Sequence, residues 1–384
     1  MKQADVHIVQ VSSKKVYGLT LEGGGAKGAY HIGSYFALKE KGFEFDCVVG
    51  TSIGAINAAM IVSGDVHKCA NLWRNTTMAD YYNRDDEVSE IVDKDISDIE
   101  ELILKIKNLV SDTISKAELS IEPVRNLINK NIDERKVRES NTRFGLVTLN
   151  LTDKKTEELF IDEIPQGKLK KYILASCYLP IFKMEPLEGK YYLDGGFVNN
   201  IPYNMVQKMG LTPVIIRTKH SIVKNFYMPK DAIIIEPSKS YTSLMDFDPV
   251  KADEIIRIAY FDTYKALDGL LGNKYYIKPF SDEYALEVLR KIFFKEDTQE
   301  GENLTSKYKK LLEEAVMDIA KKYDVDWDYN YAKLLVIILE KIAQEKNIEY
   351  LKIYEMEEFI EEIRKTEKIK EDKNSFFKRL AKRI

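Results

Sequence analysis

The sequence predicts an α/β protein with a mainly parallel central sheet flanked by helices. Near the start of the chain, apolar runs typical of strands alternate with helix-like runs in the order strand, helix, strand, helix. Each of the first two strands ends in a glycine-containing turn that leads into a helix. Strands that are joined through helices pair in parallel with right-handed crossovers, so this order predicts a parallel sheet.

The individual elements follow from apolar periodicity and from the residues that commonly begin or end helices. The expected strands cover residues 16–21, 43–49, 143–151, 157–161, 191–193, 213–217 and 232–235. The expected helices cover residues 29–41, a small-residue run that begins after position 52, residues 169–177 and residues 250–271. Gly42 follows the first helix, as glycine often does at a helix end.

We expect two domains. Residues 15–275 form the α/β domain, which is the candidate catalytic domain, and residues 276–384 form a helical region rich in Lys and Glu. Within the first domain, residues 76–139 are rich in charge and only weakly helical. We interpret residues 76–139 as an insertion or lid-like helical region, although a solvated helical face explains the charges equally well.

Composition narrows the functional classes. The net charge of −4 over 384 residues does not favour a nucleic-acid partner. The three widely spaced cysteines, Cys47, Cys69 and Cys177, argue against a disulfide framework and suit a reducing compartment. The first residues lack the apolar core of a signal peptide, and the longest apolar run, residues 334–339, is too short to span a bilayer. We therefore expect a cytoplasmic protein.

Two glycine-framed segments follow the first two strands and together indicate acyl-transfer chemistry. The first consists of Gly23, Gly24, Gly25, Ala26, Lys27 and Gly28. The second consists of Gly50, Thr51, Ser52, Ile53 and Gly54. Converging N–H groups of a glycine loop can hold an oxyanion, and a G-x-S-x-G turn between strand and helix holds a serine as nucleophile. The sequence therefore predicts an oxyanion hole at residues 23–28 and a nucleophile at Ser52.

The first segment also fits a nucleotide-binding pattern. Gly23, Gly25 and Gly28 satisfy G-x-G-x-x-G, the dinucleotide fingerprint. That fingerprint requires an acidic residue at the end of the second strand, where this chain instead has residues 50–52, and Asp46 lies earlier in the strand. No G-K-[ST] follows that would make a phosphate-binding loop. Nucleotide binding is therefore the less favoured interpretation.

The candidate base is Asp194, which ends a short strand and precedes Gly195 and Gly196. An aspartate that is buried beside a serine can accept its proton directly. An ordinary Asp-Gly turn explains the same residues without chemistry. A second alternative is a Ser-Asp-His esterase for small acyl esters, which would add His220 in the chain order of α/β-hydrolases.

These motifs together resemble those of a patatin-like phospholipase. The resemblance rests on residues 23–28, residues 50–55, Asp194-Gly195-Gly196 and the segment Ala175-Ser176-Cys177 with Pro180 and Phe182. It covers about residues 15–270. It implies a three-layer patatin-like fold, a Ser52–Asp194 dyad without a catalytic histidine, phospholipids or other acyl-ester lipids as substrates, and no metal or other cofactor. Glu22 departs from the pattern, because many members carry Asp before the glycines.

The C-terminal region suggests further roles. Residues 373–384 place aromatic and aliphatic side chains on one helical face beside lysines and arginines, which predicts peripheral contact with an anionic membrane. Docking of the apolar face on its own domain, with the basic face solvated, explains the same pattern and is the more favoured interpretation. A partner-regulated lipid-binding effector, with residues 276–384 as its main module, is a further hypothesis. Residues 324–335 begin like a calcium loop but lack its glycine and its final glutamate, so no metal site is predicted.

Overall fold

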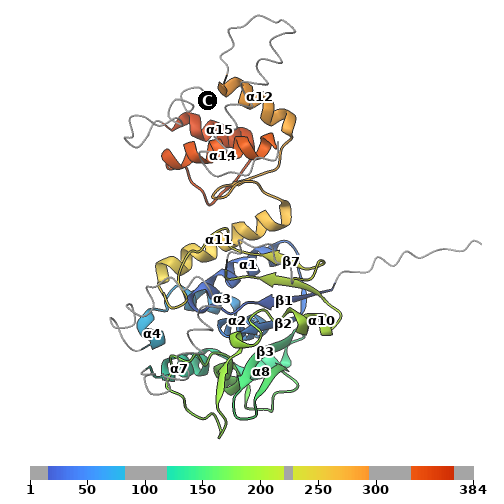
Figure 1. Cartoon of the computed structure of the whole chain (residues 1–384), viewed down its shortest axis with the longest axis vertical. Coiled ribbons are helices and arrows are strands. Elements are labelled where there is room, and N and C mark those ends of the chain that lie inside the picture. The colour runs from blue at the N-terminus through green and yellow to red at the C-terminus, as the bar shows by residue number, and fades with distance from the viewer. Residues whose placement is uncertain (1–15, 83–118, 220–227, 294–329, 367–384) are drawn as a thin grey trace, which may run out of the picture. The chain divides into compact units, whose positions relative to one another are not determined.

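The fold is given by a computed structural model of the chain (Figure 1). It describes residues 16–82, 119–219, 228–293 and 330–366. The chain divides into two compact units, Met1–Tyr260 and Phe261–Ile384. Four features of the sequence predictions lie outside the described residues: residues 83–118 of the predicted insertion, His220, the rejected calcium loop up to residue 329, and the C-terminal segment 373–384.

A seven-stranded sheet forms the centre of the first unit. Its strands are β1 (Tyr17–Leu21), β2 (Phe45–Thr51), β3 (Arg143–Asn150), β4 (Lys155–Phe160), β5 (Tyr192–Asp194), β6 (Thr212–Ile216) and β7 (Ile233–Ile235). The spatial order is β4-β3-β2-β1-β6-β7, and β5 pairs with β3. Strands β3, β2, β1, β6 and β7 are parallel, whereas β4 and β5 run antiparallel to β3. The predicted mainly parallel sheet is confirmed.

Helices cover both faces of this sheet. Successive residues of a strand point to opposite faces. Gly50 of β2 lies against the Gly54 backbone of α2 (Ile53–Val62) on one face. On the other face, Cys47 and Val49 pack in one core with Met205 and Val206 of α10 (Tyr203–Lys208). The first unit is therefore a three-layer arrangement of helix, sheet and helix.

The remaining helices of the first unit connect or flank these layers. They are η1 (Gly25–Gly28), α1 (Ala29–Glu40), α3 (Val66–Trp73), α4 (Met78–Tyr82), α7 (Glu122–Asn131), α8 (Glu134–Glu139), α9 (Leu169–Ser176) and η2 (Gly195–Phe197). Helix α11 (Pro249–Asp268) follows β7. The backbone of Ile256 in α11 lies directly against Gly33 of α1. None of the helices in the described part of the chain has the length and apolar character that a membrane span needs.

The second unit has its own hydrophobic core. Its elements are β8 (Tyr276–Ile277), α12 (Asp282–Phe293), α14 (Tyr331–Glu345), β9 (Ile353–Tyr354) and α15 (Met356–Lys365). The buried Glu340 of α14 accepts backbone N–H bonds from residues 273, 274 and 275, each at 2.8 Å. Sequence reasoning missed β9, because two residues carry no alternating pattern.

Candidate active site

Two strands bring Ser52 and Asp194 together. Strand β4 pairs along one edge of β3, so β2 and β5 share the other edge. Strand β2 runs parallel to β3 and ends with Thr51 opposite Val147. Strand β5 runs antiparallel and ends with Asp194 opposite Thr148. The C-terminal ends of β2 and β5 therefore meet at neighbouring residues of β3, and Ser52 follows directly on one of them.

Ser52 occupies the turn between β2 and α2. Its backbone has φ 56° and ψ −126°, a left-handed conformation that non-glycine residues rarely adopt and that is often associated with functional sites. The Ser52 N–H donates to Ser176 Oγ at 2.9 Å. A Cβ at Gly50 would lie 2.2 Å from the Gly54 carbonyl oxygen, so the turn closes only with glycine there. Strand β2, the strained Ser52 and helix α2 therefore follow one another through a tight turn.

Asp194 presents a buried carboxyl to this turn. Its exposed fraction is 2%, and its Oδ1 accepts the Gly196 N–H at 2.7 Å. The other carboxylate oxygen, Oδ2, has no hydrogen-bond partner among the described residues. Burial raises the pKa of Asp194 to about 6, although the nearby Ser52 side chain and the Gly196 N–H act in the opposite direction. A carboxyl with this pKa is ionised at neutral pH and can still take up a proton.

The glycine loop has two N–H groups with no acceptor in the described part of the chain. The N–H groups of Gly23 and Ala26 donate to the carbonyl oxygens of Asn200 and Leu244, at 3.1 and 2.8 Å. Those of Gly24 and Gly25 find no such partner among the described residues. Gly25 has φ 54°, and a Cβ there would lie 2.1 Å from the Leu244 carbonyl oxygen. The N–H groups of Gly24 and Gly25 are available to an anionic oxygen.

A buried ion pair supports the loop. Glu22 precedes the first glycine, and its Oε2 accepts from Arg217 Nε at 3.0 Å and from the Thr218 N–H at 2.7 Å. Thr218 Oγ1 donates to the Gly23 carbonyl oxygen at 2.9 Å. The ion pair joins side chains that are only 3% and 8% exposed. Glu22, the departure from the usual aspartate, therefore links the start of the loop to the end of β6.

Asn57 of α2 connects this loop to the neighbouring helices. Its Nδ2 donates to the Gly28 carbonyl oxygen at 2.9 Å and lies 3.1 Å from His31 Nδ1. Its Oδ1 accepts from Trp73 Nε1 at 3.2 Å and from the Cys69 thiol at 3.3 Å. His31 is fully buried, and burial lowers its pKa to about 3. His31 is therefore neutral at physiological pH.

The buried His31 is expected to make folding sensitive to acid. Its pKa in the folded chain is about 3, against the ordinary 6.5, so between these values the unfolded chain binds more protons. The stability that neutral His31 contributes is complete above pH 6.5 and is lost as the pH decreases below that value. It decreases by about 2 kcal/mol between pH 6.5 and pH 5. Urea unfolding at pH 7 and pH 5 measures this change in the free energy of unfolding. The difference between the two pH values should become smaller in His31→Gln, whereas the control His67→Gln, at an exposed position, should leave it unchanged. Equal pH dependence in wild type and His31→Gln would contradict this account.

Several residues of the site carry no motif that reveals their role. The sequence singled out Ser176 and Cys177 only through the family resemblance. Asn200, Arg217 and Thr218 had no signal, because their partners lie about 180 to 196 residues away in the chain. The Cys177 thiol lies near Ser52 and Asp194, and burial holds its pKa well above the usual range. All three cysteines are free and buried.

No cluster that could hold a metal ion occurs within residues 16–82, 119–219, 228–293 and 330–366. The two predicted motifs and Asp194 meet in one place, which contains a half-buried serine, a buried carboxyl and the N–H groups of Gly24 and Gly25. The other candidate base, His220, lies outside the described residues.

A central sheet flanked by helices, with a serine on a strand–helix turn, is an architecture on which acyl hydrolases are built. Residues 19–206 match the family model described as Patatin-like phospholipase. Over these residues the chain belongs to the patatin-like phospholipase family. The match includes the glycine loop, Ser52 and Asp194, and it confirms the resemblance found in the sequence.

Individual relatives are distant. Patatin-like phospholipase domain-containing protein ZK370.4 of Caenorhabditis elegans is 24% identical over 71% of this chain and 19% of its own length. Neuropathy target esterase sws of Drosophila melanogaster is 25% identical over 70% of this chain and 18% of its own length. The chain thus spans under a fifth of these two relatives. The crystal structure of VipD from Legionella pneumophila has a TM-score of 0.41 at 17% identity, covering 92% of this chain and 84% of that one.

Proposed function

We propose that this protein is a serine hydrolase that cleaves fatty-acyl esters of phospholipids or lysophospholipids, with Ser52 as nucleophile and Asp194 as general base. The observation that carries the proposal is the meeting of β2 and β5 at Val147 and Thr148 of β3. This meeting supports the proposal because β5 ends in a buried carboxyl, whose Oδ2 has no partner among the described residues, and β2 leads into a strained serine. Membership of the patatin-like phospholipase family supports lipid esters as the substrate class.

The reaction proceeds through acylation and deacylation of Ser52, and Asp194 takes up and returns one proton in each half. Ser52 Oγ attacks the acyl carbonyl carbon while Asp194 Oδ2 accepts the hydroxyl proton. The N–H groups of Gly24 and Gly25 donate to the oxyanion of the tetrahedral intermediate, and removal of such a donor costs about 3–4 kcal/mol in known hydrolases. Asp194 then returns the proton to the leaving alcohol. A water molecule, deprotonated by Asp194, then attacks the acyl-enzyme carbonyl carbon. The bond to Ser52 Oγ breaks, Asp194 returns the proton to that oxygen, and the fatty acid is released.

The helix that follows Ser52 stabilises the negative charge that develops on the oxyanion. Helix α2 begins at Ile53, so its first-turn N–H groups and the positive end of its dipole lie at the nucleophile. The buried Glu22–Arg217 pair fixes the start of the glycine loop, which keeps its donors in place before substrate arrives. Cytoplasmic placement, with peripheral membrane contact through residues 373–384, belongs to the same proposal and stays a prediction.

Fatty-acid release from mixed phospholipids, followed by lipid mass spectrometry, tests the proposed function. Wild type should release free fatty acid together with the corresponding lysolipid or glycerophosphodiester. His220→Ala should retain wild-type activity, because Asp194 takes the proton without a histidine. Loss of most activity in His220→Ala would favour the Ser-Asp-His alternative. Absence of fatty-acid release from every phospholipid, lysophospholipid and neutral lipid ester by the full chain would refute the proposed function.

A further inference from the structure

The turn at the end of helix α9 contacts both Ser52 and Asp194. Ser176 Oγ accepts the Ser52 N–H, and the Tyr178 carbonyl oxygen accepts the Asp194 N–H, each at 2.9 Å. The Cys177 thiol, which lies between these two residues in the chain, is near Ser52 and Asp194. These three consecutive residues, the α9 turn, therefore connect the ends of β2 and β5, in addition to the pairing of both strands with β3.

The bond from Ser52 to Ser176 supports a backbone conformation that is unfavourable by itself. Ser52 has φ 56°, in the left-handed region, which non-glycine residues keep only where their surroundings fix it. Ser176 is fully buried, so water does not compete for the bond between its hydroxyl and the Ser52 N–H. An N–H group that loses its acceptor in such surroundings is destabilised. The Ser176 hydroxyl therefore favours the left-handed conformation of Ser52.

The α9 turn is itself fixed by Tyr178. The Tyr178 side chain is buried, and its hydroxyl donates to the Lys183 carbonyl oxygen at 2.7 Å and accepts the Glu185 N–H at 3.0 Å. Its ring packs edge-on against Phe182, with 6.3 Å between the ring centroids. The contacts to the ends of β2 and β5 therefore come from one anchored segment, and not from two independent loops.

We propose that Ser176 is a positioning residue for the nucleophile and that the α9 turn sets the separation between Ser52 Oγ and Asp194 Oδ2. The inference rests on the proposed function, in which Ser52 passes its proton directly to Asp194. Direct transfer requires the two oxygens to lie within hydrogen-bond reach, because no imidazole stands between them to relay the proton. A misplacement of about 1 Å lowers the rate of such a step about 100-fold.

Removal of the Ser176 hydroxyl tests this role. In Ser176→Ala, kcat for p-nitrophenyl butanoate should fall about 100-fold while KM stays within about twofold, because the nucleophile is displaced and the substrate contacts remain. Ser176→Cys keeps a weaker acceptor at the same position, so its kcat should lie between those of wild type and Ser176→Ala. A kcat of Ser176→Cys below that of Ser176→Ala would count against the hydrogen bond as the cause.

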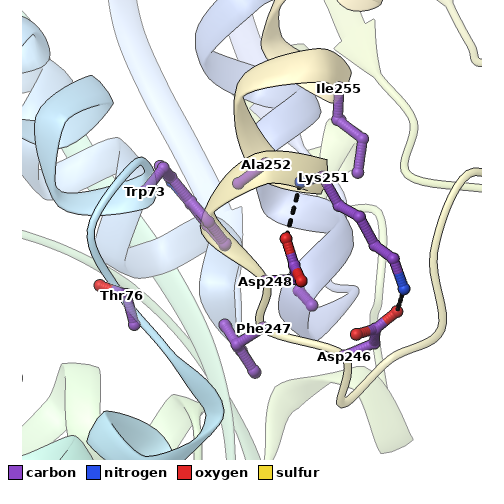
Figure 2. A pocket seen from close by; sticks show the side chains of 9 residues that line it. Trp73, Thr76, Asp246, Phe247, Asp248, Lys251, Ala252 and Ile255 are labelled. Carbon is purple, nitrogen blue, oxygen red and sulfur yellow. Dashed lines mark hydrogen bonds and ion pairs between the residues drawn. The ribbon is translucent and has the colours of Figure 1, made fainter.

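The matched control is Thr76→Val, which removes another buried hydroxyl that is bonded to the backbone. Thr76 Oγ1 donates to the Leu72 carbonyl oxygen of α3 at 2.8 Å. Figure 2 shows Thr76 on the opposite side of a small pocket from the Asp246–Lys251 ion pair. Thr76→Val should keep the kcat of wild type. A comparable loss of kcat in Thr76→Val and in Ser176→Ala would overturn the positioning role.

Amide hydrogen exchange gives a second readout that does not need turnover. The Ser52 N–H should exchange about tenfold faster in Ser176→Ala than in wild type, because its acceptor is lost, whereas Thr76→Val should leave this rate unchanged. Fragmentation mass spectrometry of peptides that span β2 and α2 resolves the exchange at Ser52. Ser176→Cys takes the place of Ser176→Ala in both measurements if the latter does not fold.

The two readouts separate this inference from the proposed function. If wild type hydrolyses no ester but exchange at Ser52 is faster in Ser176→Ala, the hold of Ser176 on the Ser52 backbone stands and the proposed function is removed. If wild type hydrolyses esters and Ser176→Ala keeps full kcat, or shows unchanged exchange at Ser52, the positioning role alone is overturned.

Discussion

Replacing Ser52 with Ala is expected to lower kcat/KM for acyl-ester hydrolysis by about 10⁴-fold or more, the size of loss seen when a serine hydrolase loses its nucleophile. The substitution removes the only atom that the proposal allows to form the acyl-enzyme, while the glycine loop keeps its donors. Stopped assays of fatty-acid release and trapping of the acyl-enzyme by mass spectrometry measure the two consequences.

The control is Ser63→Ala, which removes a serine at the opposite end of the same helix. It loses a hydroxyl that donates to the Met60 carbonyl oxygen, so its effect should be limited to stability. Activity in the Ser52→Ala protein above a few per cent of wild type would remove Ser52 from the mechanism. The loss must also appear without a change in the unfolding midpoint, since Ser52 has a strained backbone and an unfolded variant would lose activity for that reason alone.

Replacing Asp194 with Asn is expected to lower kcat by about 10⁴-fold, the scale on which removing a catalytic carboxylate acts. The amide keeps the shape of the side chain and can still accept the Gly196 N–H, but it cannot take the Ser52 proton. The matched control is Asp162→Asn, which removes an exposed carboxylate paired with Arg143 at 2.6 Å. Comparable losses in the two variants would indicate a general effect of charge removal instead of lost base catalysis.

Asp194 is also expected to set the pH dependence of kcat/KM. Burial raises the pKa of Asp194 to about 6, and the base must be ionised to act. Wild-type kcat/KM should therefore be level at neutral pH and fall about tenfold per unit below pH 6. A histidine base would also make kcat/KM fall at a similar acidic pH, so the pH–rate profile is measured in His220→Ala as well. A limb that disappears in His220→Ala would assign the titration to the histidine.

Stability should respond in the opposite direction to activity. Because the folded-state pKa of Asp194 is raised above 3.8, the native state binds more protons than the unfolded chain between pH 3.8 and about 6. Stability is therefore lost as pH rises through this window, by at most about 3 kcal/mol. Asp194→Asn removes the destabilisation that the buried, ionised carboxylate causes at neutral pH. The buried amide N–H groups that the substitution introduces offset part of this gain. Urea unfolding at pH 7 should show a variant no less stable than wild type.

The local elements and the two glycine motifs could be predicted because they depend on contiguous residues. A strand, a Gly-x-Ser-x-Gly turn and a small-residue helix specify the elbow within the span from β2 to α2. The mainly parallel sheet follows from the order of strands and helices. Strand β9 was missed because it has two residues, and the role of Glu22 was missed because its partner Arg217 lies 195 residues further on.

The sequence by itself therefore determined the fold class, the family and the candidate residues. Only the tertiary structure decided that β5 shares an edge of β3 with β2, which places the Asp194 carboxyl at the serine turn. It also decided which N–H groups of residues 23–28 are bonded within the protein, and that Trp73, Tyr81 and Phe247 stack beside the site. The physical reason is that a motif encodes local backbone geometry, whereas burial, a shifted pKa and the stacking of aromatic side chains arise from residues that are distant in the chain.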